Sequence, residues 1–249
     1  MIRSYSLIFT IFIFQSCSYL SLNNKALLNS RTQSFSQEEE AGEFLFRRKV
    51  GFDGNKNYVV KSDLTKLGNE DIALEKTITI SKVKTINKKL RLLIPQKSES
   101  QYFLDGKKYF SRISISDKKI TVKMISPEKQ WNGEKEFVLT KGNGNICFYA
   151  NIVECAIVSG FLSKAIETNM GKMNFYIVWE GYPYFHEQFL NIPNEVFSRA
   201  TLVYDGVNRR KEHRLTLSAG GQSQFYFVDK EYKIIRHVWS SQGFQRESR

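Results

Sequence analysis

Apolar and polar residues alternate along much of this chain of 249 residues. The clearest runs contain Ile78 and Ile80, Ile113 and Ile115, Ile120, Val122 and Met124, and Leu215 and Leu217. A period of two places successive side chains on opposite faces of a β-strand. The pattern therefore predicts a half-solvated sheet, with these apolar side chains on its buried face.

Turn signals separate the alternating runs. They are Asp53-Gly54, Asp105-Gly106, Asp205-Gly206, Gly142-Asn143-Gly144-Asn145 and Gly220-Gly221. Asp-Gly between two strands favours a tight hairpin, because its turn needs positive φ angles that glycine tolerates. The chain is expected to form a meander of about ten to twelve strands.

Residues 152–167 break the alternation. Val153, Ile157 and Phe161 recur at four-residue spacing, which predicts one amphipathic helix. Asn151 followed by Glu154 is typical of a capping box at a helix start. We expect the helix to cover the sheet, a packing role rather than a cofactor site. The predicted fold class is mainly β: a strongly curved antiparallel meander, half-barrel-like, covered by this helix.

The order of strands and helix, with the closing run 228–243, resembles a class of periplasmic proteins. That class has a half-open, strongly curved sheet with helical cover and includes lipoprotein carriers. The resemblance implies a fold and carries over no functional residue.

The first residues resemble a secretory signal. Arg3 precedes an apolar run from Leu7 to Phe14. Eight helical residues span about 12 Å, which is short against a hydrocarbon core of about 30 Å. A positive start and a brief apolar core are typical of a signal peptide.

Phe14-Gln15-Ser16-Cys17 resembles a bacterial lipobox. This resemblance implies a signal peptide over residues 1–16, cleavage before Cys17 and acylation of Cys17. It also implies a lipid anchor in the cell envelope, and Ser18 favours the outer membrane, facing the periplasm. A conventional cut elsewhere, or an uncleaved anchor, remains the alternative. Residues 17–42 are polar and predict a flexible tether, followed by one β-rich domain over 43–249.

The chain is basic, with 37 Lys and Arg against 25 Asp and Glu and a formal net charge of +12. Such charges commonly form the solvated face of a sheet. The alternative is attraction to anionic lipid headgroups or cell-wall polymer. The chain carries no recognisable nucleic-acid-binding motif, so no nucleic-acid partner is predicted.

Beyond Cys17, the chain contains Cys147 and Cys155. In an oxidising compartment such a pair is a disulfide candidate, and two buried free thiols are the alternative.

Catalytic and metal-binding patterns are weak. His186, His213 and His237 lack metal-ligand spacing, and His186 is expected at a surface or interface. No enzyme activity, cofactor or metal is predicted. We expect a binding or structural module, with candidate lining of an acyl-chain or apolar-segment site at Phe175, Ile177, Trp179, Phe225 and Phe227. The alternatives are a basic envelope scaffold and an enzyme of unrecognised type.

Overall fold

The computed structural model describes residues 31–39, 42–87, 90–139, 145–187 and 194–248. Over these ranges, 15 strands form one continuous sheet in the order β8-β7-β6-β5-β4-β3-β2-β1-β15-β14-β13-β12-β11-β10-β9. Neighbouring strands are antiparallel, except for the parallel pair β9 and β10. The mainly β fold class is confirmed, with more strands than the ten to twelve predicted.

The first half of the sheet is a meander in chain order. Its strands are β1 (Arg31–Glu39), β2 (Gly42–Phe52), β3 (Asn57–Lys66), β4 (Asn69–Thr85), β5 (Arg91–Leu104), β6 (Lys107–Ile115), β7 (Lys119–Ile125) and β8 (Gly133–Val138). A short 3₁₀ helix, η1 (Lys129–Trp131), precedes β8.

The second half begins with the short helices and ends beside the first strand. Its elements are β9 (Ile146–Phe148), η2 (Tyr149–Asn151), α2 (Ile152–Val158), α3 (Phe161–Thr168), β10 (Gly171–Val178), α4 (Tyr184–Glu187), β11 (Phe197–Val207), β12 (His213–Ala219), β13 (Gln222–Val228), β14 (Ile234–Trp239), η3 (Ser240–Gln242) and β15 (Phe244–Ser248).

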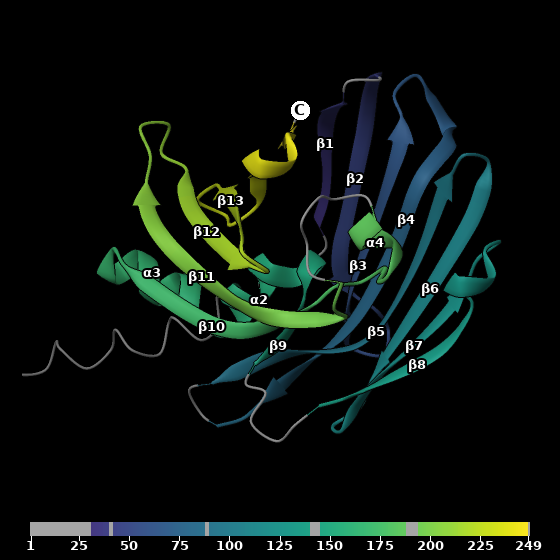
Figure 1. The fold of residues 1–249 in the computed structure, drawn as a ribbon. Helices are drawn as coiled ribbons and strands as arrows, with labels where there is room; N and C mark the ends of the chain where they lie inside the picture. Colours follow the sequence, from purple (N-terminus) through teal and green to yellow (C-terminus); the bar gives the residue numbers. More distant parts are fainter. Residues whose placement is uncertain (1–30, 40–41, 88–89, 140–144, 188–193, 249) are drawn as a thin grey trace, which may run out of the picture.

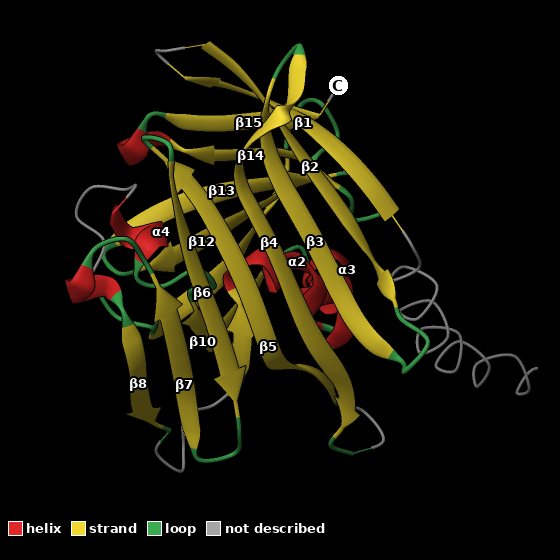
Figure 2. Ribbon diagram, turned by 90° about the vertical axis from the view of Figure 1, so that its right-hand side faces the viewer, coloured by secondary structure: helices red, strands yellow, loops and turns green. Residues whose placement is uncertain are grey.

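The two halves curve towards each other, with α4 between them (Figure 1). Pairing of β1 with β15 joins the halves along one seam. Helix α2 packs against β5 and β9, and α3 packs against β10 and β11. Seen from the side of β3 to β5, both helices lie behind the sheet (Figure 2). The helices therefore fill part of the space that the curved sheet encloses.

Strand β1 corrects part of the predicted tether. Residues 31–39 pair with β2 on one side and, over residues 35–37, with β15 on the other. Phe35 anchors this polar strand, because its side chain is buried against Phe46 and Leu64. The remaining tether residues 17–30, and Cys17 itself, lie outside the described residues.

The single predicted helix over 152–167 is two helices. They meet at an angle of 66°, and the break contains Gly160 with a φ of 75°. Asn151 does not cap α2, because its Oδ1 accepts a hydrogen bond from Thr79 Oγ1 at 2.9 Å instead. Within the described residues no single helix is long and apolar enough to span a membrane; α2 with its preceding turn and α3 meet that test only together, as a bent pair.

Three of the predicted turns are confirmed. Asp105 and Gly106 connect β5 to β6 with φ angles of 50° and 72°. Gly220 and Gly221 connect β12 to β13, and the Asp53 turn connects β2 to β3. The prediction of a turn at Asp205-Gly206 is wrong, because this pair lies inside β11, where the register shifts at a β-bulge. The predicted turn at Gly142-Asn143-Gly144-Asn145 is not tested, because residues 142–144 lie outside the described ranges.

The inner face of the sheet follows the predicted alternation in most strands. Ile113, Ile120, Val122, Leu215 and Leu217 are buried as predicted. In β4 the prediction is wrong, because Ile78 is exposed whereas Thr77 and Thr79 are buried. The two threonine hydroxyls donate inside the fold, to Ser100 Oγ at 3.0 Å and to Asn151 Oδ1 at 2.9 Å. Hydrogen bonding thus replaces apolar contact on this strand.

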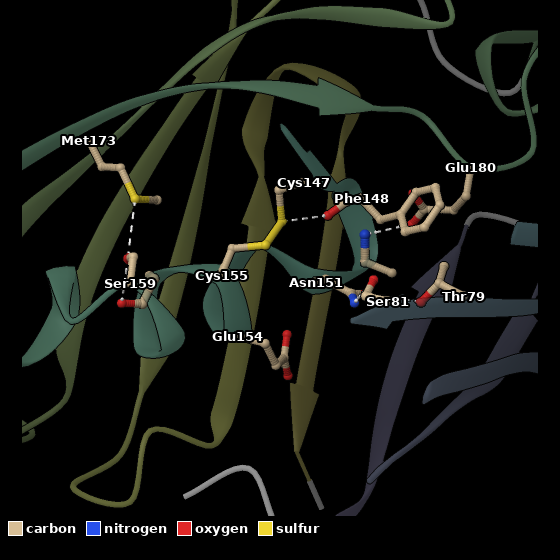
Figure 3. Close-up of a disulfide and its surroundings, with 12 residues drawn as sticks. Thr79, Ser81, Cys147, Phe148, Asn151, Glu154, Cys155, Ser159, Met173 and Glu180 are labelled. Atoms are coloured by element: carbon tan, nitrogen blue, oxygen red, sulfur yellow. Dashed lines mark hydrogen bonds between the residues drawn. A yellow bond between two sulfur atoms is a disulfide. The ribbon is translucent and has the colours of Figure 1, made fainter. Parts of the chain in front are cut away.

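Cys147 and Cys155 form a disulfide with a Cα–Cα distance of 6.5 Å. It joins β9 to the middle of α2 (Figure 3), and both cysteines are buried. The bond holds the helix against the strand from which the chain enters it.

We expect the double variant Cys147→Ser/Cys155→Ser to be less stable than the wild type. The bond closes a loop with a sequence separation of 8. Loop-closure entropy for so short a loop gives a loss of about 2–3 kcal/mol, measured by urea unfolding. Reductant should lower the stability of the wild type by a similar amount and leave the double variant unchanged. Equal stability of the two proteins would contradict this account.

Candidate functional site

A cavity of about 550 Å³ lies between the two halves of the sheet. Its walls come from β1 to β5 on one side, from β13 to β15 on the other, and from η2 and the segment around α4. The lining residues are Phe35, Phe46, Arg48, Ser62, Leu64, Leu74, Glu75, Thr77, Leu104, Tyr149, Ala150, Glu180, Phe185, Tyr226, Ile234, His237, Gln242, Gly243, Phe244 and Arg246.

One part of the lining is apolar and lies near the β1–β15 seam. Phe35, Phe46 and Leu64 form a small hydrophobic cluster, against which Leu74 and Ile234 pack. Leu74 reaches the cavity through a register shift: Leu64 pairs with Glu75, Thr65 pairs with Ala73, and Leu74 is left over. Such a bulge turns two successive residues towards one side of a strand. Leu74 and Glu75 therefore both line the cavity.

Polar side chains form much of the remaining lining, and one of them, Arg48, makes an ion pair with α2. Arg246 lies over the ring of Phe46, so the polar and apolar parts of the lining meet there. Arg48 on β2 donates to Glu154 Oε1 at 2.6 Å and to the carbonyl oxygen of Ala150 at 2.9 Å. Both side chains are almost fully buried. The pair fixes α2 against the wall of the cavity, and each charge neutralises the other.

The loop after β10 brings Glu180 into the cavity. Trp179 Nε1 donates to Ser198 Oγ at 2.9 Å, and Ser111 Oγ donates to the carbonyl oxygen of Tyr182 at 2.6 Å. Gly181 has a φ of 82°, and a Cβ there would lie 2.0 Å from Tyr102 Oη. Only glycine combines this backbone conformation with so close a neighbour. The loop is thus held on both sides of Glu180.

Glu180 is an acid in a desolvated position. Its side chain is 5% exposed, and Oε1 accepts a hydrogen bond from the backbone N–H of Ala150 at 2.6 Å. Burial raises the pKa of Glu180 to about 8, although the backbone N–H groups of Glu180 itself, Ala150 and Tyr149 oppose this shift. The nearby carboxylate of Glu75 adds to the upward shift. Burial also raises the pKa of Glu75, although Arg246 opposes this shift. Glu180 is therefore mostly protonated at neutral pH.

A hydrogen-bonded group from three elements completes the polar part. Tyr149 Oη donates to Gln224 Oε1 at 2.6 Å, and His237 Nε2 lies 2.9 Å from the same oxygen. Tyr226 stacks on His237 with ring centroids 4.2 Å apart. Burial, aided by Arg246, holds the pKa of His237 well below its usual range. His237 is consequently a neutral, hydrogen-bonded side chain at neutral pH.

None of the five candidate lining residues lines this cavity. Phe175, Ile177 and Trp179 belong to the main hydrophobic core. Phe225 and Phe227 are half-buried and lie on the other face of β13 from Tyr226, below the guanidinium groups of Arg214 and Arg236. The sequence pattern identified β13 correctly but gave no sign of which face turns inward, because both faces are aromatic.

The histidines are dispersed. His186 is 6% exposed and packs among Trp179, Tyr182 and Phe185, so its predicted surface position is wrong. Burial lowers the pKa of His186 to about 4. Over the residues that the structure describes, no group of three or more His, Cys, Asp or Glu side chains could hold a metal ion.

Comparison with known proteins gives no family. No family model matches the chain, and no curated protein matches it. Among solved structures, it is similar to a beta-barrel-like protein of domain of unknown function DUF1849 from Brucella abortus. The TM-score is 0.48 at 10% identity, over 89% of this chain and 95% of that chain. At this level of similarity nothing about the cavity or its ligand follows.

We expect Glu180→Gln to remove a pH-dependent loss of stability. The folded-state pKa of about 8 lies above the ordinary value of 4.5, so between these values the folded protein binds one proton more than the unfolded chain. Stability of the wild type therefore falls as the pH rises from about 5 to about 8, by up to about 1.4 kcal/mol per pH unit from this group.

The measurement is urea unfolding of both proteins at several pH values. The free-energy difference between wild type and Glu180→Gln should shift in favour of the variant as the pH rises. Glu134→Gln removes an exposed carboxylate from β8 and is the matched control. A constant difference between wild type and Glu180→Gln over this range would show that the carboxyl group ionises normally.

Proposed function

We propose that this protein is a lipid-anchored binding protein of the bacterial cell envelope that holds one amphipathic molecule in the cavity and catalyses no reaction. The observation that carries the proposal is the cavity itself. A volume of about 550 Å³ lies within the range of small-molecule sites, about 300–1,000 Å³.

The two parts of the lining support an amphipathic ligand. An acyl or alkyl chain would replace water beside Phe35, Leu64, Leu74 and Ile234. Each CH₂ group buried there contributes about 0.8 kcal/mol. A molecule that was apolar throughout would place hydrocarbon beside Glu180 and deprive that carboxyl group of hydrogen bonds. A polar head at the Glu180 end avoids this cost.

The anchor is the second component of the proposal and rests on the lipobox-like run that ends at Cys17. Two or three acyl chains give stable membrane attachment, which a single chain does not. The chain between Cys17 and the first described strand, at Arg31, would link this anchor to the sheet. The protein would then work close to a bilayer, a source of amphipathic molecules, on the periplasmic side of the outer membrane.

Leu74→Trp tests the binding site. The larger side chain should fill the apolar part of the cavity and weaken binding of the uncharged fluorophore N-phenyl-1-naphthylamine at least about ten-fold, a free energy of about 1.4 kcal/mol. Binding is measured as fluorescence enhancement, with full-length chain carrying Cys17→Ser so that no acyl chain on residue 17 competes for the cavity.

The matched control is Ile78→Trp on the same strand. Ile78 is 37% exposed and does not line the cavity, so this variant should bind the fluorophore as the parent does. Circular dichroism and the unfolding midpoint establish that both variants fold. Equal loss of binding in both, or in neither, would contradict a site in this cavity.

Cys17→Ser tests the anchor. The wild-type protein should partition into the detergent phase of Triton X-114 and carry a mass increment for acyl chains on its mature amino terminus. The serine variant should lack this increment, because the acyl donor reacts with the cysteine sulfur. A wild-type protein that carries no lipid would refute the anchor and leave the cavity proposal standing.

A further inference from the structure

The interior around the cavity contains several ionisable groups besides the neutral imidazole of His237. Three carboxyl groups, Glu75, Glu154 and Glu180, accompany two guanidinium groups, Arg48 and Arg246. Arg48 is paired with Glu154. Arg246 lies over the rings of Phe46 and Phe244 and acts electrostatically on Glu75. Glu180 is the third carboxyl group, and none of the ion pairs found among the described residues involves it.

Glu180 also has an unused hydrogen-bonding atom. Oε1 is bonded to the backbone of Ala150, whereas Oε2 is buried and has no hydrogen-bond partner among the described residues. A buried carboxyl oxygen without a partner costs free energy that a bound donor would recover. The close approach of Gly181 to Tyr102 and the hydrogen bond from Ser111 to Tyr182 hold the loop that places Glu180 at the cavity.

Electron-rich rings line the same part of the cavity. Tyr149, Phe185 and Tyr226 are lining residues, and the rings of Tyr149 and Phe185 lie 5.4 Å apart. The face of an aromatic ring attracts a cation, and this attraction strengthens where water is excluded. A carboxyl group beside several aromatic rings is a suitable environment for an ammonium group, which donates hydrogen bonds and carries one positive charge.

We propose that the polar end of the cavity binds the primary ammonium head of an alkylamine-type amphiphile, with Glu180 as its counter-ion. This inference rests on the proposed function, since it specifies the head group of the molecule held there. Glu180 Oε2 accepts a hydrogen bond from the ammonium group, and the alkyl chain extends towards Phe35 and Leu74.

Proton release accompanies binding. In the empty cavity Glu180 carries a proton at neutral pH; on binding, this proton passes to solvent and the carboxylate pairs with the ammonium group. The ionisable groups that face Glu180 or share its cavity are Glu75, Tyr102, Tyr149, Tyr226, His237 and Arg246, besides the Arg48–Glu154 pair. Burial raises the pKa of each of these tyrosines and lowers that of His237, so none of the four ionises between pH 6 and 9.

The test compares three ligands with the same chain: octylammonium, octanol and octanoate. Each displaces N-phenyl-1-naphthylamine from full-length Cys17→Ser protein. Octylammonium should bind about ten-fold more tightly than octanol at pH 8, as one charge-assisted hydrogen bond predicts. Its advantage over octanol should grow from pH 6 to pH 9, because Glu180 ionises in this interval while the ligand remains protonated.

Glu180→Gln keeps the shape of the side chain and removes its charge. This variant should bind octylammonium about ten-fold more weakly and bring the ratio of octylammonium to octanol affinity close to one. Glu134→Gln, on the exposed strand β8, should keep the ratio of the parent. Circular dichroism establishes folding, and the pH profile of the parent protein provides an independent readout if the variant does not fold.

The outcomes separate the two proposals. Octanol or octanoate binding as tightly as octylammonium, or a preference that survives Glu180→Gln, would overturn the ammonium inference and leave the cavity as an amphiphile site. If none of the three ligands displaces the fluorophore, and the fluorophore itself does not bind, both proposals fail.

Discussion

The ion pair between Arg48 and Glu154 joins two parts of the chain that are 106 residues apart. Arg48 belongs to the wall formed by β2, and Glu154 belongs to the helix that fills the inside of the curved sheet. Removing one partner from a buried pair leaves an uncompensated charge, at a cost of about 3–5 kcal/mol. The pair therefore ties α2 to β2 at the wall of the cavity, which Arg48 lines.

Small hydroxyl side chains on the inner face of β3 to β6 explain how polar segments enter this interior. Ser62, Thr77, Thr79, Ser81, Ser98, Ser100 and Ser111 are all buried. Thr79 bonds Asn151 at the start of α2, and Ser111 bonds the loop that carries Glu180. Larger apolar residues at these positions would fill the space that η2 and the loop occupy. Two of these hydroxyl groups also satisfy acceptors brought in with those segments, Oδ1 of Asn151 and the carbonyl oxygen of Tyr182.

Much of the fold could be predicted from the sequence because it depends on local patterns. Alternation identified the strands, and two-residue turns such as Asp105-Gly106 identified the hairpins. The candidate site could not be predicted in this way. Alternation on β4 favoured an inward Ile78, since nothing local indicates that Thr77 and Thr79 find partners on β5 and near α2. Aromatic residues occupy both faces of β13, and Leu74 reaches the cavity only through a register shift. Glu180 lies in a loop, and a charged loop residue is expected at the surface from sequence alone; only the tertiary fold buries it.

The position of Glu180 is difficult to explain as packing alone. Glutamine or an apolar residue would fill a similar volume without a carboxyl group that burial keeps from ionising. Yet the neighbouring backbone adopts a positive φ at Gly181, and the side chains of Ser111 and Trp179 hold the loop in place. Structural polar groups usually have all their hydrogen-bonding atoms satisfied, whereas Oε2 of this residue, like Oε2 of Glu154, has no partner among the residues that the structure describes. An acid in a cavity whose pKa is strongly perturbed by desolvation is a candidate for a functional site. In the proposed complex, an ammonium group completes the hydrogen bonding of Oε2 once Glu180 has released its proton.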